Sequence, residues 1–228
     1  MSAQIFAYCE RGTDPGFWAE PLNALSNAAF LVAALLAWWL WRQRQPDARR
    51  AVDLALVVLV AAIGTGSFLF HTFATRWAAI ADVLPITVFM LAYMAYALRR
   101  FLVLPWIWVA GGLAVFMAAL SSAEWLVCGG SGRCFNGSAG YFPAVAALAV
   151  MGVWLSVRRH PAAVSLIWAG GLLALSLIFR TIDWSVCEQT RFLTASPWGT
   201  HFIWHLANGT LLYVLLRAAI VHGEAKMR

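Results

Sequence analysis

Charged residues are scarce in this sequence of 228 residues. They make up 11% of it, and hydrophobic residues make up 62%, whereas an average soluble domain carries about 25% charged residues. So little charge excludes an ordinary soluble domain and indicates a multi-pass integral membrane protein. Linker-like polar stretches are lacking too. We therefore expect one domain over residues 1–228, with residues 1–20 outside the membrane.

The apolar stretches lack the alternation of apolar and polar residues that a transmembrane β-barrel requires. Each is instead a continuous run of about the 20 residues that a helix needs to cross a bilayer. The runs predict an all-α bundle of seven transmembrane helices. They lie near residues 21–41, 51–73, 79–98, 104–121, 139–157, 162–180 and 199–221.

The basic residues give a net charge of +6 and lie in short runs between the apolar stretches. This distribution does not indicate a nucleic-acid partner, and it follows the positive-inside rule. Eleven of the sixteen Lys and Arg residues fall on one side of the predicted membrane, among them Arg158 and Arg217. We expect that side to be cytoplasmic, with the C-terminus inside and the N-terminus outside or in a lumen.

The chain has only four cysteines, and all of them fall on the predicted outer side. An even number of cysteines in an oxidising compartment indicates disulfides. Three pairings exist. We favour Cys9–Cys187, which would tie the N-terminal segment to the loop before the last helix, and Cys128–Cys134, which would close a short glycine-rich loop. Four free thiols are the alternative.

Ionisable residues inside the predicted spans are few, and such residues are functional hypotheses by default. His201 and His205 share one helix face at the start of the last span, with the spacing from which two imidazoles bind one metal ion. His71 lies near the outer end of the second span and Asp82 near the outer start of the third. All four are expected at a similar depth. Three histidines and a carboxylate are the groups of a catalytic zinc site with its base.

Each of these residues also has a purely structural interpretation. A lone histidine at a helix end is usually interfacial or hydrogen-bonded, and a histidine pair one turn apart can simply pack. Asp82 is placed to cap its helix N-terminus. Ser67, four residues before His71 and on the same face, can be a helix-packing hydroxyl. The common depth of the set favours one site.

Other polar residues are placed to support such a site. Asn208 continues the histidine face of the last span, and Asp183 closes the sixth span on the outer side. Glu20, Asn23 and Asn27 form a polar stripe on the first span. We expect the asparagines and Asp183 to orient the metal ligands rather than to bind the metal. Glu20 can simply favour the first turn of its helix.

Four segments together form a family pattern. They are residues 8–10, 17–27, 66–71 with the Asp-x-x-Pro motif of 82–85, and 182–188 with 201–205. In this order and spacing the sequence resembles the alkaline ceramidases, which belong to a wider group of seven-helix membrane hydrolases that includes the adiponectin-receptor-like proteins. The resemblance also implies a disulfide between Cys9 and Cys187.

The resemblance implies roles for the matching residues. His71, His201 and His205 would be the zinc ligands. Asp82 would move the proton of the attacking water, and Ser67 would hold that water or the developing oxyanion. The implied activity is hydrolysis of the amide bond of an N-acyl lipid in the bilayer, with ceramide giving a sphingoid base and a fatty acid.

The family also has a calcium site in its N-terminal segment, and Glu10 and Glu20 match it. Two positions depart from the pattern. Ala7 stands where an acidic residue is expected, and the stretch that contains Gly12 is one residue shorter. Asp14 is the residue that would compensate, because calcium takes six to eight oxygen ligands.

Three other functions are alternatives. A serine hydrolase does not fit the pattern, since residues 64–67 lack the glycine that follows the nucleophile in the usual elbow and lie in a predicted helix. A b-type cytochrome would use His71 and either His201 or His205, which leaves one histidine idle. A seven-helix receptor or lipid-binding protein would keep the bundle and even the metal, and it is the main alternative to an enzyme.

Overall fold

The computed structural model describes residues 4–130, 134–192 and 197–224. Seven of its helical segments are long and apolar enough to cross a membrane, which confirms the predicted fold class. The spans are α1 (Pro21–Ser26) continued by α2 (Ala28–Gln43), α3 (Ala51–Phe73), α4 (Arg76–Tyr96) continued by the π-helical turn η2 (Ala97–Phe101), α5 (Trp106–Cys128), the 3-10 turn η4 (Ala139–Tyr141) continued by α6 (Phe142–Val157), α7 (Ala163–Ile182) and α8 (His201–His222).

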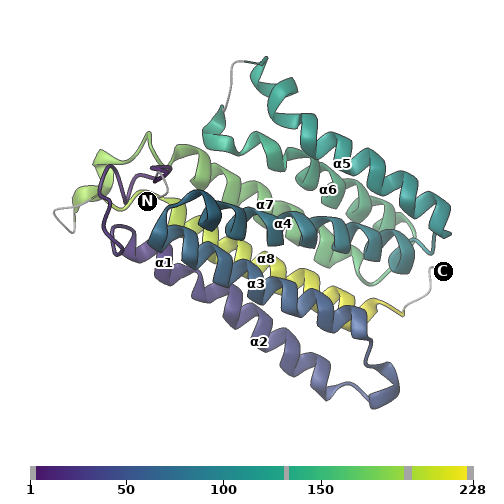
Figure 1. The fold of residues 1–228 in the computed structure, drawn as a ribbon. Coiled ribbons are helices and arrows are strands. Elements are labelled where there is room, and N and C mark those ends of the chain that lie inside the picture. The colour runs from purple at the N-terminus through teal and green to yellow at the C-terminus, as the bar shows by residue number, and fades with distance from the viewer. Residues whose placement is uncertain (1–3, 131–133, 193–196, 225–228) are drawn as a thin grey trace.

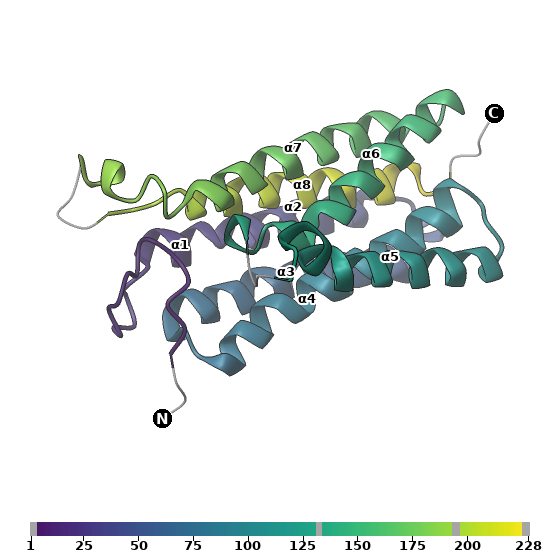
Figure 2. The same cartoon turned by 90° about the horizontal axis from the view of Figure 1, so that it is seen from above.

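The last helix, α8, runs through the middle of the bundle between α7 and α2 (Figure 1 and Figure 2). It is the most buried of the seven spans, with 61% of its most apolar window inside the protein. The short connections are a 3-10 turn η1 (Pro46–Ala48), η3 (Phe135–Gly137) and η5 (Glu188–Phe192). Because α8 touches so many neighbours, side chains on its faces are placed to meet groups from several other helices.

Two predicted spans are longer in the structure than the sequence suggested. α4 begins at Arg76 rather than near residue 79, and α5 continues to Cys128 rather than ending near residue 121. In α5 the hydroxyls of Ser121 and Ser122 donate to the carbonyls of the residues four positions earlier. These polar side chains are therefore satisfied within the helix and do not end it.

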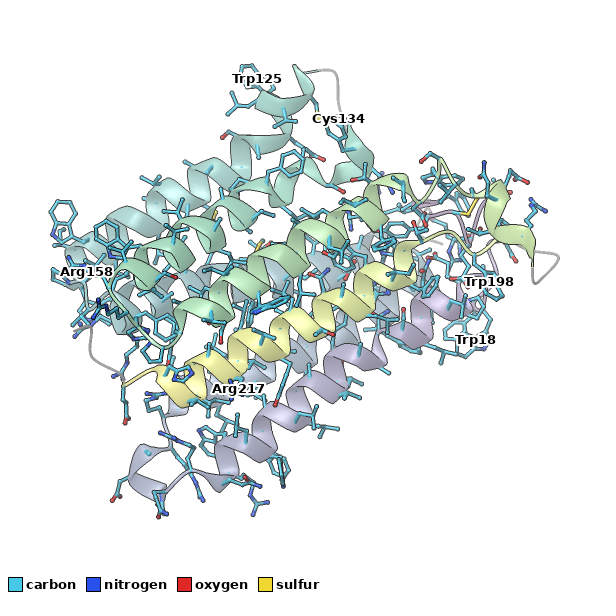
Figure 3. All side chains as sticks on the ribbon, turned by 180° about the vertical axis from the view of Figure 1, so that it is seen from behind. Trp18, Trp125, Cys134, Arg158, Trp198 and Arg217 are labelled. Atoms are coloured by element: carbon cyan, nitrogen blue, oxygen red, sulfur yellow. A yellow bond between two sulfur atoms is a disulfide. The ribbon has the colours of Figure 1, made fainter. Side chains whose placement is uncertain are left out.

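The two ends of the bundle carry different kinds of side chain. Figure 3 places Trp18 and Trp198 at one end, and Arg158 and Arg217 at the other. Residues 4–20 fold over the first of these ends, where the Ile5 amide donates to the carbonyl of Ala74 after α3. Arg158 and Arg217 share an end, as the charge distribution predicted.

Both favoured disulfides are present. Cys9 is bonded to Cys187, across 178 residues of sequence, and Cys128 to Cys134 across 6. The four-thiol alternative is therefore wrong for this structure. The long-range bond fixes the N-terminal segment to the chain just before α8.

Polar anchors set the register of α8 at the end that carries Arg217. Arg50 and Tyr96 both donate to the carbonyl of Ala219, at 2.7 and 2.9 Å. Tyr93 donates to the carbonyl of Leu215 at 3.0 Å. These bonds hold the C-terminal part of α8 against α3 and α4, and so they fix the depth of its N-terminal part as well.

α3 packs tightly against α4 at Gly66. A Cβ atom there would collide with the carbonyl oxygen of Ala81. Gly66→Ala is therefore expected to force α4 outward and to lower the free energy of unfolding by about 1–3 kcal/mol, the usual cost of overpacking. Unfolding in detergent micelles measures this. Gly171→Ala is the matched control, because a Cβ there meets no atom within 4 Å, and equal stability of the two variants would contradict the expectation.

Candidate metal centre

The three predicted histidine ligands come together inside the bundle. His71 projects from the last turns of α3, and His201 and His205 from the first two turns of α8. The ring centroids of His71 lie 5.2 Å from His201 and 4.8 Å from His205, and those of His201 and His205 are 4.6 Å apart. None of the three side chains is more than 1% exposed.

One ligand atom from each histidine lies within 4.8 Å of the others. Among the described residues this is the only group of three or more His, Cys, Asp or Glu side chains with such geometry. Each ring also has one buried nitrogen without a hydrogen-bond partner in that part of the chain: Nε2 of His71, Nδ1 of His201 and Nε2 of His205. An unpaired buried polar atom costs about 1–3 kcal/mol. The residues therefore fit a metal ion, whose positive charge would take up these lone pairs.

Two of the histidines are oriented by side chains of the first span. Nδ1 of His71 lies 2.5 Å from Oε2 of Glu20, and Nδ1 of His205 lies 2.7 Å from Oγ of Ser26. Each contact turns the unpaired Nε2 toward the cluster, and a partner on the second ring nitrogen is usual for metal-bound histidines. Neither role was predicted from the sequence. The available signal was the polar stripe on the first span, since Ser26 follows Asn23 by three residues.

The third histidine is held by stacking. The ring of His201 lies parallel to that of Tyr8, at 3.6 Å between centroids and 18° between planes. On α8 itself Trp204 stacks at 5.3 Å and 10°. Tyr8 comes from the N-terminal segment, so this segment covers one wall of the group formed by His71, His201 and His205, here called the metal cluster.

Asp183 fixes the start of α8 to the N-terminal segment. Its carboxylate accepts hydrogen bonds from the backbone amides of Cys9 at 2.9 Å, Thr200 at 2.7 Å and His201 at 3.0 Å. Burial raises the pKa of this carboxyl, and the three amide donors oppose that rise. The expected supporting role of Asp183 thus has a concrete form, because it positions the backbone of one histidine.

Asp82 and Ser67 lie beside the cluster. Asp82 is half-buried on α4, and its charged and polar neighbours include His71, Ser67 and Arg180. Oδ1 of Asp82 and Oγ of Ser67 are buried and make no hydrogen bond to the described residues. Asp82 lies in the second turn of α4, and Thr75 occupies the N-cap position. The alternative that Asp82 caps its helix is therefore wrong.

A cavity of about 310 Å³, here called the polar cavity, opens beside the histidines. Its walls include Asp82, His201 and Arg180, so the metal cluster and the carboxylate face the same space. A second cavity of about 90 Å³, here called the apolar cavity, lies between the helices and has an almost entirely apolar lining. The two share Tyr141 and Trp204 in their walls. The polar and the apolar cavity are therefore neighbours, with these two side chains between them.

Arg180 is a site residue that the sequence analysis did not single out. Its guanidinium lies over the rings of Tyr8, Tyr141 and Trp204, at 5.8, 5.4 and 5.5 Å from their centroids. It donates to the Tyr8 hydroxyl at 3.2 Å. Its Nε is buried without a partner among the described residues. The signal was available, because Arg180 is a charged residue within a predicted span.

The three asparagines have different positions. Asn23 donates to Oε2 of Glu20 at 3.0 Å, and so it helps to orient the carboxylate that contacts His71. Asn27 donates to the carbonyl of Asn23 at 2.7 Å. Asn208 donates to Oγ of Ser176 at 2.9 Å and lines the apolar cavity. Of the three, Asn23 is nearest to the role expected from the sequence.

The three carboxylates expected to bind calcium do not form one group of metal ligands among the described residues. Glu10 accepts hydrogen bonds from the backbone amides of Leu22 and Asn23, both at 2.8 Å, and so caps α1. Asp14 is exposed and binds within its own loop. The Glu20 carboxylate contacts Nδ1 of His71 in the metal cluster. Within the described residues these side chains form no second group suited to a metal, so they do not fit the calcium site that the resemblance implied.

Glu20→Gln tests whether its carboxylate supports the metal cluster. The substitution keeps the shape and removes the charge that faces Nδ1 of His71. We expect the affinity for metal to fall about 10–100-fold, as is typical for partners of metal-bound histidines. Competition against a chromophoric chelator measures this. Glu188→Gln, at an exposed ion pair on the surface, is the matched control, and unchanged affinity in Glu20→Gln would assign Glu20 a purely structural role.

Comparison with known proteins agrees with this geometry. A search of curated proteins found no match. The sequence model of the ceramidase family matches residues 7–226, which is nearly the whole chain and contains every residue of the metal cluster and its surroundings. The chain therefore belongs to the ceramidase family.

Proposed function

We propose that this protein is a zinc-dependent amidohydrolase that cleaves the amide bond of an N-acyl lipid within the membrane. Ceramide is the substrate that the family favours, and its products are a fatty acid and a sphingoid base. The observation that carries the proposal is the buried histidine cluster, with three unpaired nitrogens, beside a cavity that also contains a carboxylate. Family membership supports the reaction type.

His71, His201 and His205 would hold the ion as neutral ligands. When bound, a zinc ion would supply a water of lowered pKa and would polarise the carbonyl. Three histidines are a common ligand set for catalytic zinc. The polar cavity that reaches His201 is the space in which substrate and water would meet the ion.

Asp82 acts as the general base and then as the general acid. Its carboxylate takes a proton from the attacking water as the new carbon–oxygen bond forms, and it passes that proton to the nitrogen as the carbon–nitrogen bond breaks. The Ser67 hydroxyl donates a hydrogen bond to the oxyanion. Both side chains have an oxygen without a partner among the described residues, so each is available to water and substrate.

The two cavities would bind different parts of the substrate. The scissile amide and head group occupy the polar cavity, where the free Nε of Arg180 can donate to a hydroxyl or carbonyl oxygen. Hydrocarbon enters the apolar cavity past Tyr141 and Trp204. Because the cavity lies within a membrane-spanning bundle, a lipid can reach it from the bilayer. The charge distribution predicts that water arrives from the outer side.

Purified protein in detergent tests the proposal. Its metal content is measured by mass spectrometry, and fatty acid and amine are quantified after incubation with a panel of N-acyl lipids that includes ceramides. We expect one zinc ion per chain and equal amounts of the two products. Stoichiometric zinc without turnover on the whole panel would favour the receptor function. Protein purified without metal that binds no added zinc would overturn the proposal, and a Soret band would support the cytochrome.

A further inference from the structure

The guanidinium of Arg11 lies between the N-terminal loop, the Glu20 carboxylate and the end of α3. The side chain is fully buried, and all five of its N–H donors have an acceptor. The acceptors are one carboxylate oxygen and four backbone carbonyl oxygens. They are Oε1 of Glu20 at 2.6 Å, the carbonyls of Asp14 and Gly16 at 3.2 and 2.9 Å, and those of His71 and Thr72 at 2.8 and 3.2 Å.

This acceptor set consists of oxygen atoms only, as in the sites that hard divalent cations occupy in proteins. It joins three separate parts of the chain: the N-terminal loop, Glu20 and the end of α3. We propose that the guanidinium of Arg11 takes the place of a bound calcium ion in this part of the fold and links the same three parts of the chain. The N-terminal segment and the metal cluster are then held together without calcium, which accounts for the failure of Glu10, Asp14 and Glu20 to form a calcium site.

Arg11 acts on the metal cluster through Glu20. One carboxylate oxygen of Glu20 accepts from Arg11 and the other contacts Nδ1 of His71. The planar guanidinium presents its donors in a fixed geometry. Arg11 is therefore a positioning residue that holds the Glu20 carboxylate aimed at a histidine.

Arg11 also closes the end of α3. The last carbonyls of a helix have no partner within the helix, and a cation near them is favourable. Nη2 of Arg11 donates to the carbonyls of His71 and Thr72, and Nη1 donates to those of Asp14 and Gly16. The loop is thereby fixed to the helix that supplies a metal ligand. A monovalent side chain thus makes the cross-links that would otherwise need a bound ion.

Calcium titration of the wild-type protein is the first test. In protein purified into calcium-free buffer, we expect addition of about 1 mM calcium, the weak end of calcium-module affinities, to leave the melting temperature unchanged. Isothermal titration should detect no calcium site. Stabilisation by calcium with one bound ion per chain would overturn the inference, since the site would then be open to a divalent cation in the presence of Arg11.

Arg11→Ala is the second test, because it removes the cation and leaves the oxygen atoms. We expect a lower melting temperature and about 10–100-fold weaker metal binding at the histidines, with partial recovery of both when calcium or methylguanidinium is added. A merely structural role for Arg11 would not predict recovery by either cation. Arg49→Ala is the control, because Arg49 also donates to backbone carbonyls but in an exposed loop.

Arg11→Lys covers the case in which Arg11→Ala does not fold. Lysine keeps the positive charge but not the five-donor fork, so we expect intermediate metal affinity that calcium does not improve. Normal stability and metal affinity in Arg11→Ala without added cation would overturn the inference, as would metal affinity in Arg11→Lys as low as in Glu20→Gln. The link to turnover rests on the proposed function, but these measurements need no turnover and therefore separate the two proposals.

Discussion

Replacement of His205 by alanine is expected to abolish both metal binding and hydrolysis of N-acyl lipids. The variant would keep two of three ligands and would leave a gap in place of the His205 ring, whose centroid lies 4.8 Å from that of His71 and 4.6 Å from that of His201. Affinity should fall by more than the roughly 10–100-fold that loss of a supporting residue costs. Metal analysis after dialysis and a fatty-acid release assay measure the two effects, and turnover should reach background.

His222→Ala is the matched control for this variant, since His222 lies at the opposite end of the same helix. It should keep the metal and the activity. Both variants should retain the helical circular dichroism signal, because α8 is anchored at its other end by Tyr93 and Arg50. Full metal occupancy in His205→Ala would show that this histidine is not a ligand.

Asp82→Asn is expected to separate metal binding from catalysis. Asparagine keeps the shape of the side chain and cannot accept the proton, so zinc should remain bound while kcat falls about 10²–10⁴-fold, the usual contribution of a general base. KM should change little, because the substituted side chain still fits the polar cavity. Steady-state kinetics on the best substrate of the panel, with metal analysis of the same sample, measure both.

Asp47→Asn, in the exposed turn η1 far from the cavities, is the control. Retained turnover in Asp82→Asn would move the proton-transfer role to another group. Glu124 is then the residue to examine, because it is a second carboxylate in the wall of the polar cavity. Loss of zinc in Asp82→Asn would instead make Asp82 part of the metal-binding shell.

The sequence predicted the span count, both disulfides and the three clustered histidines. These features depend on signals that survive without tertiary structure: the length of apolar runs, cysteines confined to one side, and ionisable groups at matched depth. The end of α5 was predicted too early, because Ser121 and Ser122 satisfy their hydroxyls inside the helix. No apolar pattern encodes such local hydrogen bonds.

The residues that surround the histidines were much harder to predict from the sequence. Residues 4–20 are irregular, so no periodicity predicts that Tyr8 stacks on His201 or that Arg11 reaches Glu20. Glu20 was assigned to a calcium site because the family pattern gives the type of residue at each position, while its partners are set by packing. In the structure the neighbouring arginine takes one of its oxygens and a metal-cluster histidine the other.

The disulfide between Cys9 and Cys187 has a consequence for the order of events during synthesis. The first ligand, His71, is made early, but the other two lie on α8, which is made after α3 to α7. The N-terminal segment that carries Tyr8 can be secured somewhat sooner, because Cys187 emerges before His201 and His205. The metal cluster is therefore completed only when α8 has been inserted, and a chain that stops before α8 carries no assembled metal site.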